Sequence, residues 1–144
     1  MKKRLIIIGL SLIAIIAVGF LIFQSNKTDI NAKAAEYRAH NYAIENSPRY
    51  KEVIDDVMRE VYTTYAQNQI DDLESCPEFL DSEQKQKIEK AKELISSDPE
   101  KAAELFMMLG SCHELWYLQK KILKEKYDII WYTPTECHPD IIFD

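Results

Sequence analysis

Glycine is scarce in this chain. Only three glycines occur among 144 residues, at positions 9, 19 and 110, so a single one follows the apolar N-terminus. A fold made of many short strands needs tight turns, and these depend on residues at positive φ, which glycine adopts most readily. The scarcity therefore disfavours a sandwich or barrel, and we predict an all-α fold in the main.

Recognisable catalytic motifs are also lacking. The chain has no glycine-rich phosphate loop, no paired-carboxylate motif and no Cys-x-x-Cys or His-x-x-x-His spacing. Acidic residues cluster around positions 55–56 and 71–83, but without the ligand spacing of a calcium loop. We therefore expect no enzyme activity and no cofactor.

Histidine follows cysteine directly at two places, Cys112-His113 and Cys137-His138. Neighbouring side chains diverge by about 100° on a helix and face opposite sides of a strand, so such a dipeptide rarely gives both groups to one tetrahedral ion. A thiolate nucleophile would need an orienting base that the spacing does not supply. A thiol-dependent or metal-dependent function of these two pairs remains an alternative hypothesis.

Three cysteines in an exported domain first suggest a disulfide. Two helices of similar length that form an antiparallel hairpin between Cys76 and Cys112 would bring the chain back to the level at which it started. The two thiols would then lie close together, and we predict that they pair. Cys112 with Cys137 is the rival pairing, because connectivity cannot be deduced from sequence. In the preferred scheme Cys137 is left over as a thiol for bonding to another chain.

Export is predicted from the N-terminus. Residues 5–23 are apolar except for Gly9, Ser11 and Gly19, and they follow the basic run Lys2-Lys3-Arg4. As a helix this segment measures about 28 Å, close to the thickness of the hydrocarbon core of a bilayer. We predict that residues 1–26 are an uncleaved signal-anchor; a cleaved signal peptide is the alternative, and it also exports the chain.

Charge sets the orientation and the class of partner. The basic cluster at residues 2–4 should stay in the cytoplasm, which places the rest in the periplasm or outside the cell. All 24 acidic residues but only 15 of the 18 basic ones follow residue 26, so residues 27–144 have a formal charge of −9. That sign disfavours nucleic acid, which is bound through Lys and Arg. We expect contact with lipid only through residues 5–23, and a protein partner of basic character.

The remaining chain divides into three predicted parts. Residues 27–46 form a polar juxtamembrane linker with a short helix from about residue 31. Residues 47–126 form a helical bundle, with capping signals at Ser47, Asp81 and Asp98, the second as a capping box with Gln84. An apolar stripe at spacings of three and four follows Ser47, from Tyr50 to Tyr65. The same spacing continues across Gly110, which predicts one last long helix from Asp98 to about residue 126. Residues 127–144 form an apolar tail, extended or folded into a short β-hairpin of residues 129–132 and 141–143.

Protein binding is the function that this organisation favours. The predicted contacts are the aromatic residues of the tail and an acidic pair, namely Trp131, Tyr132, Phe143, Asp55 and Asp56. The tail could equally cover its own bundle, since a small domain needs its apolar side chains for its core. Two functions fit: an inhibitor or immunity protein against a basic toxin or envelope enzyme, and a structural subunit of an envelope assembly, with homo-oligomers in the second case.

Overall fold

The chain is mainly helical, which confirms the mainly all-α prediction. A computed structural model describes the backbone of residues 2–143 and the side chains of residue 16 and residues 18–143. Within that range there is no β-strand. The elements are α1 (Lys2–Glu45), α2 (Pro48–Glu74), the 3-10 turn η1 (Pro77–Phe79), α3 (Ser82–Leu94), α4 (Pro99–Glu104), α5 (Ser111–Tyr127) and α6 (Pro134–Cys137).

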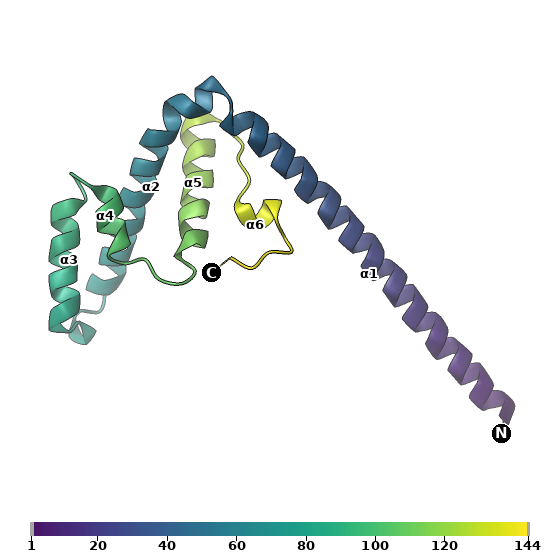
Figure 1. Ribbon diagram of the computed structural model, residues 1–144. Helices are drawn as coiled ribbons and strands as arrows, with labels where there is room; N and C mark the ends of the chain where they lie inside the picture. The colour runs from purple at the N-terminus through teal and green to yellow at the C-terminus, as the bar shows by residue number, and fades with distance from the viewer. Residues whose placement is uncertain (1, 144) are drawn as a thin grey trace.

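The helices form a small bundle from which one long helix projects (Figure 1). The central helix α2 packs against α4 on one side and α5 on the other, and α3 lies outside α4. The C-terminal segment with α6 fills the angle between α5 and the end of α1 nearest the bundle. The bundle is therefore attached to α1 by the turn at residues 46–47 and by the C-terminal segment.

The helix α1 is continuous through the stretch that we expected to be a linker. No proline or glycine lies between residues 20 and 47 to interrupt it. Asp29 and Lys33 form an (i, i+4) ion pair of 3.6 Å, an arrangement that supports an exposed helix modestly. The first buried side chain along the described part of α1 is Ala34. The polar residues 24–33 thus form a helical spacer.

The predicted membrane span falls mostly outside the described side chains, because those of residues 5–15 and 17 are not among them. Within the described residues, no helix is both long and apolar enough to cross a bilayer.

All three predicted helix starts in the bundle are confirmed. Ser47, Asp81 and Asp98 each accept a hydrogen bond from the backbone N–H three residues later, which satisfies one of the free donors of the first turn. Asp81 also forms the expected capping box with Gln84. Proline follows Ser47 and Asp98 at the first helical position, where its missing N–H costs nothing.

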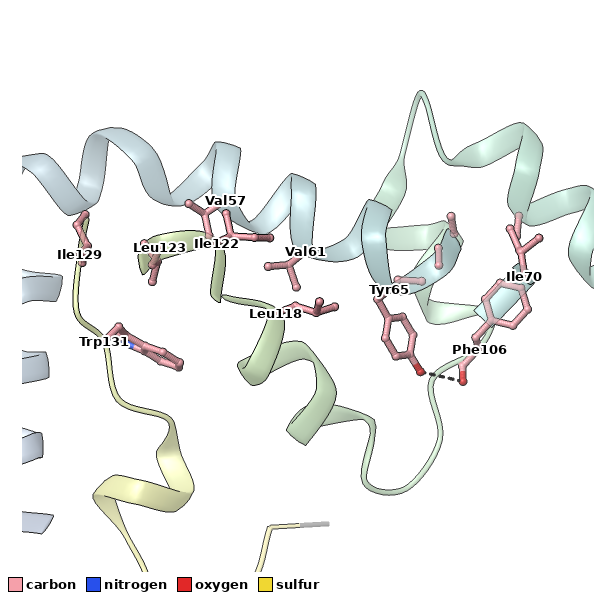
Figure 2. Close-up of a cluster of buried hydrophobic side chains, with 14 of the residues drawn as sticks. Val57, Val61, Tyr65, Ile70, Phe106, Leu118, Ile122, Leu123, Ile129 and Trp131 are labelled. Carbon is pink, nitrogen blue, oxygen red and sulfur yellow. Dashed lines mark hydrogen bonds between the residues drawn. The ribbon is translucent and has the colours of Figure 1, made fainter. Parts of the chain in front are cut away.

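The core lies between α2, α4 and α5 (Figure 2). The predicted stripe of α2 supplies Val57, Val61 and Tyr65, all of which are almost completely buried. Leu123 of α5 packs into the same cluster, and Phe106 follows α4. The hydroxyl of Tyr65 donates to the carbonyl of Phe106 at 3.3 Å, so its one polar atom is satisfied within the core.

The predicted long helix from Asp98 to residue 126 is wrong. The structure divides it into α4 and α5, with a loop at residues 105–110. Gly110 has φ of 87°, a left-handed conformation that ends helical continuity, and the hydroxyl of Ser111 accepts from the Met108 N–H at 2.9 Å. The three-and-four apolar spacing across Gly110 was therefore misleading, because the loop buries Phe106 and leaves Met108 and Leu109 in solvent.

The predicted β-hairpin of the tail is also wrong. Asp128 ends α5 with a left-handed φ of 52°, residues 129–133 form no regular element and do not pair as a strand, and residues 134–137 form α6. The sequence carried a signal for this helix that was missed: Thr133 and Glu136 form a capping box, with Pro134 at the first helical position. The alternative prediction, an extended tail, applies at most to residues 129–133.

Candidate functional site

The C-terminal segment is bound to α1 by side chains that hydrogen-bond to its backbone. The amide nitrogen of Asn41 donates to the Tyr132 carbonyl at 2.6 Å, and its amide oxygen accepts from the Tyr132 N–H at 3.0 Å. Next to Asn41 on α1, the His40 ring lies 2.9 Å from the carbonyl of Ile130, and one turn earlier Arg38 donates to the carbonyl of Cys137. These three side chains, from about one turn of α1, supply hydrogen bonds that a neighbouring strand would otherwise give the tail.

Aromatic residues of the tail pack into this junction. Tyr132 stacks on Tyr37 of α1, with ring centroids 3.9 Å apart. Trp131 is only 6% exposed, and its indole N–H donates to Glu45 at 2.9 Å. Burial of an indole with its N–H satisfied stabilises the tail on its own bundle. In the structure Trp131 therefore packs on its own bundle, and Tyr132 is half-buried in the same junction; their predicted contact with a partner stays a prediction.

An ion pair fastens α6 to α5. Lys120 donates to both carboxylate oxygens of Glu136, at 2.6 and 2.7 Å. Burial alone would raise the pKa of Glu136, but hydrogen bonds from Lys120 and Thr133 outweigh it and lower that pKa below its ordinary value. The carboxylate is thus held ionised, and it caps α6 while it binds α5.

None of the three cysteines is joined to another in the structure. The expected pairing of Cys76 with Cys112 assumed a hairpin of two equal helices, but α3 has 13 residues and α4 only six. After the short α4 the chain turns away through the loop at residues 105–110 into α5, which packs on α2. Cys76 is exposed at the end of α2, and Cys112 is half-buried in the first turn of α5.

Cys137 is the least accessible of the three thiols. It is buried under α1, where the amide nitrogen of Asn41 lies 3.6 Å from its sulfur. Burial raises the pKa of this thiol, and the nearby carboxylate of Glu136 adds to the increase. The expected bond from Cys137 to another chain would therefore require the tail to leave α1.

The two Cys-His pairs lie apart, on α5 and at the end of α6. His113 contacts the C-terminus: its Nε2 is 3.0 Å from the carbonyl of Phe143. His138 follows α6 beside the hollow that Arg38 and Trp131 line, which measures about 310 Å³. Among the described residues, no three side chains of His, Cys, Asp and Glu come together as metal ligands.

The predicted acidic pair lies on the exposed face of α2. Asp55 and Asp56 line a shallow hollow of about 350 Å³ together with Asp98 and Glu100 at the start of α4. Arg59, which also borders the hollow, donates to the carbonyl of Ser96 at 3.2 Å. Of these four carboxylates Asp98 is paired with Lys101, and with Arg59 as the other nearby cation the surface keeps a negative character.

A second exposed surface was not predicted from the sequence. It consists of loop residues 107–109 and tail residues 141–143, with Trp116 between them, and we call it the distal patch. Phe143 meets Trp116 edge to face, with centroids 5.2 Å apart, which fixes the end of the tail beside α5. Met108, Leu109 and Ile142 are 76%, 82% and 88% exposed. Of the predicted tail aromatics, only the half-buried Phe143 belongs to this surface.

Comparison with known protein families, with characterised proteins and with solved structures finds no match to this chain.

Proposed function

We propose that the chain is a membrane-tethered helical domain that acts outside the cytoplasm by binding another protein. The observation that carries the tether is the exposed apolar segment of α1. Phe20, Leu21, Ile22 and Phe23 are consecutive and all exposed, and at about 100° per residue they cover the whole circumference of the helix. A helix that is apolar on every side is typical of a membrane span or a large core, and this small bundle does not cover it.

The orientation that we propose follows from charge. Lys2, Lys3 and Arg4 precede the apolar segment, whereas Lys27 and Asp29 balance each other after it. The N-terminus then stays in the cytoplasm and the bundle lies in the periplasm or outside the cell. The helical residues 24–33 would hold the bundle away from the membrane surface as a semi-rigid spacer.

An inhibitor or immunity protein against a basic toxin or envelope enzyme is the partner-binding role that we favour. Its support is the charge of −9 on residues 27–144 and the carboxylates around Asp55 and Asp56. Complementary charge raises association rates and excludes acidic competitors. A small exported domain without a catalytic motif fits such a role.

A structural subunit of a cell-envelope assembly is the second candidate. The observation that favours it is the uninterrupted course of α1, which passes from the apolar segment into the bundle without a flexible joint. Such a helix could pair with other membrane helices, including those of further copies of this chain. In that case binding would depend on the apolar segment rather than on the acidic face.

The test of the tether is a topology measurement on the full chain. Alkaline phosphatase fused after residue 144 should be active, because that enzyme folds only outside the cytoplasm, whereas green fluorescent protein at the same position should stay dark when exported through the general pathway. Replacing Phe20 and Ile22 with Lys should release the fusion from the membrane fraction. A phosphatase fusion that is inactive but stable, or a wild-type chain that stays in the soluble cytoplasmic fraction, would refute the proposal. The mass of the mature chain separates an anchor from a cleaved signal.

Two variants of the chain distinguish the two proposed binding roles. Cross-linking in intact cells, followed by mass spectrometry, should recover a basic partner that is lost with Asp55→Asn/Asp56→Asn if the inhibitor role is right. Partners that persist in this variant and disappear when the apolar segment is exchanged for an unrelated membrane helix would support the structural role.

A further inference from the structure

We infer that the distal patch binds an apolar segment of another protein, one whose apolar side chains are flanked by Lys or Arg. This inference deepens the protein-binding part of the proposed function and does not depend on the membrane tether. It names the surface and the chemistry of the partner.

The patch is a defined surface because the end of the chain is fixed there. The His113 ring lies 3.0 Å from the Phe143 carbonyl and makes an edge contact of 5.4 Å with Trp116, which in turn meets the Phe143 ring. In Figures 1 and 2 the last described part of the chain ends near the first turn of α5. These contacts hold residues 141–143 next to the first turn of α5, directly after the exposed loop.

The side chains of the patch are too exposed to serve the core. Leu109 and Ile142 are each more than 80% exposed, and Met108 and Ile141 are also in solvent. Single exposed apolar residues are common, but several gathered on one surface mark a binding site. The two methionines of the loop add side chains that adapt to different partner shapes.

Charge around the patch determines the kind of occupant. Residues 102–119 and 127–144 contain no Lys or Arg, whereas Glu104, Glu114 and Asp140 lie beside the exposed apolar residues in sequence. Three basic side chains from outside these stretches lie near: Lys87 stands 5.3 Å above the ring of Phe106, Arg38 lines the hollow that Asp140 and Ile141 border, and Lys101, one turn before Glu104, is paired with Asp98. Among the described residues Glu104, Glu114 and Asp140 form no ion pair, so the patch keeps an acidic rim, which favours a partner with a basic rim. The same rim disfavours a second copy of this chain and an anionic lipid surface.

The experiment measures binding of two synthetic peptides to the full chain in nanodiscs of zwitterionic lipid, with empty nanodiscs as the blank. One peptide is an amphipathic helix of Leu and Lys, and the other has Glu in place of each Lys. We expect the Leu/Lys peptide to bind and the Leu/Glu peptide not to bind. Leu109→Ser/Ile142→Ser should weaken binding at least fivefold, with no change in charge and, because both residues are exposed, no loss of fold.

Two matched variants control for general surface effects. Tyr42→Ser removes an equally exposed apolar side chain from α1, 74% exposed, and should leave the affinity unchanged. Glu104→Gln/Glu114→Gln should weaken binding and reduce its salt dependence, whereas Asp55→Asn/Asp56→Asn should do so less. If instead the α2 pair alone controls binding, the inference fails while the proposed function stands.

Other results would also overturn the inference. They are equal binding of both peptides, no binding of either, and the same loss with Tyr42→Ser as with the patch variant. Dimerisation in sedimentation that Leu109→Ser abolishes would show that the occupant is a second copy. Quenching of Trp116 fluorescence by brominated lipid, measured in the Trp131→Phe background, would show that the patch faces the bilayer.

Discussion

The side-chain amide of Asn41 exchanges two hydrogen bonds with the backbone of Tyr132, 91 residues later in the chain. An antiparallel strand pair would supply the same donor and acceptor through its backbone. Here a single buried side chain does so from a helix. The C-terminal segment can therefore be extended without belonging to a sheet, and its attachment to α1 depends strongly on one residue.

Replacing Asn41 with Leu should destabilise the domain by about 2 kcal/mol, because the N–H and C=O of Tyr132 would lose their partners in a partly buried position. Asn41→Asp keeps the acceptor for the Tyr132 N–H but turns a carboxylate oxygen towards the Tyr132 carbonyl, so it should be destabilising as well. The measurement is the free energy of unfolding from urea denaturation of the full chain. Tyr42→Leu, at an exposed neighbouring position, should change it by less than about 0.5 kcal/mol; a similar loss in both variants would show that the Asn41 contact is unimportant.

The parts of the fold that the sequence predicted are those in which local signals agree. Around Ser47 a cap, a proline and a long apolar stripe coincide, and around Asp81 a capping box precedes a periodic segment. Each signal depends on side chains within a few residues, so no knowledge of tertiary structure is needed. These helices begin where they were expected.

The parts that could not be predicted depend on distant contacts. Gly110 could continue a helix at small cost or end it at positive φ, and the sequence alone does not choose between them. In the structure Gly110 ends the helical course, and the hydroxyl of Tyr65 forms hydrogen bonds to Phe106 and Ser111 that hold the loop against α2. The composition of the tail similarly predicts strands. The residues that hold the tail in place, Asn41 and Arg38, belong to α1 and are distant in sequence. The distal patch was missed because it exists only once α4 has ended at Glu104.

A matched pair of leucines tests the core assignment. Leu123 of α5 is completely buried in the core, whereas Leu109 is exposed in the loop before α5. Leu123→Ala should destabilise the domain by about 3 kcal/mol through lost burial and the cavity that remains. Leu109→Ala should change the free energy of unfolding by less than about 0.5 kcal/mol. Equal effects in thermal or urea denaturation would contradict the break between α4 and α5.

Stability should depend on pH through Glu136. Its pKa in the folded state lies below the ordinary value of 4.5, so its contribution is fully present above that value and is lost as the pH falls through the folded-state pKa. Glu136→Gln should therefore be destabilising at pH 7, and its difference from wild type should shrink towards pH 3. Unfolding is measured at several pH values, with Glu125→Gln on the exposed face of α5 giving the effect of losing one negative charge. A difference that stayed constant with pH would refute the role of the Lys120 ion pair.

Thiol accessibility should rank the three cysteines in a fixed order. Cys76 is exposed, Cys112 half-buried and Cys137 buried with a raised pKa, and the thiolate is the reactive form. In the reduced native chain, iodoacetamide should therefore modify Cys76 first and Cys137 last, as followed by peptide mass spectrometry over time. Asn41→Leu should speed the modification of Cys137, because it loosens the tail from α1, while leaving the rate at Cys76 unchanged. Rapid labelling of Cys137 in the wild-type chain would mean that the tail does not rest on α1. A disulfide between Cys76, which follows α2, and Cys112 of α5 in chain isolated from its native compartment would contradict the free thiols that the structure has at these positions.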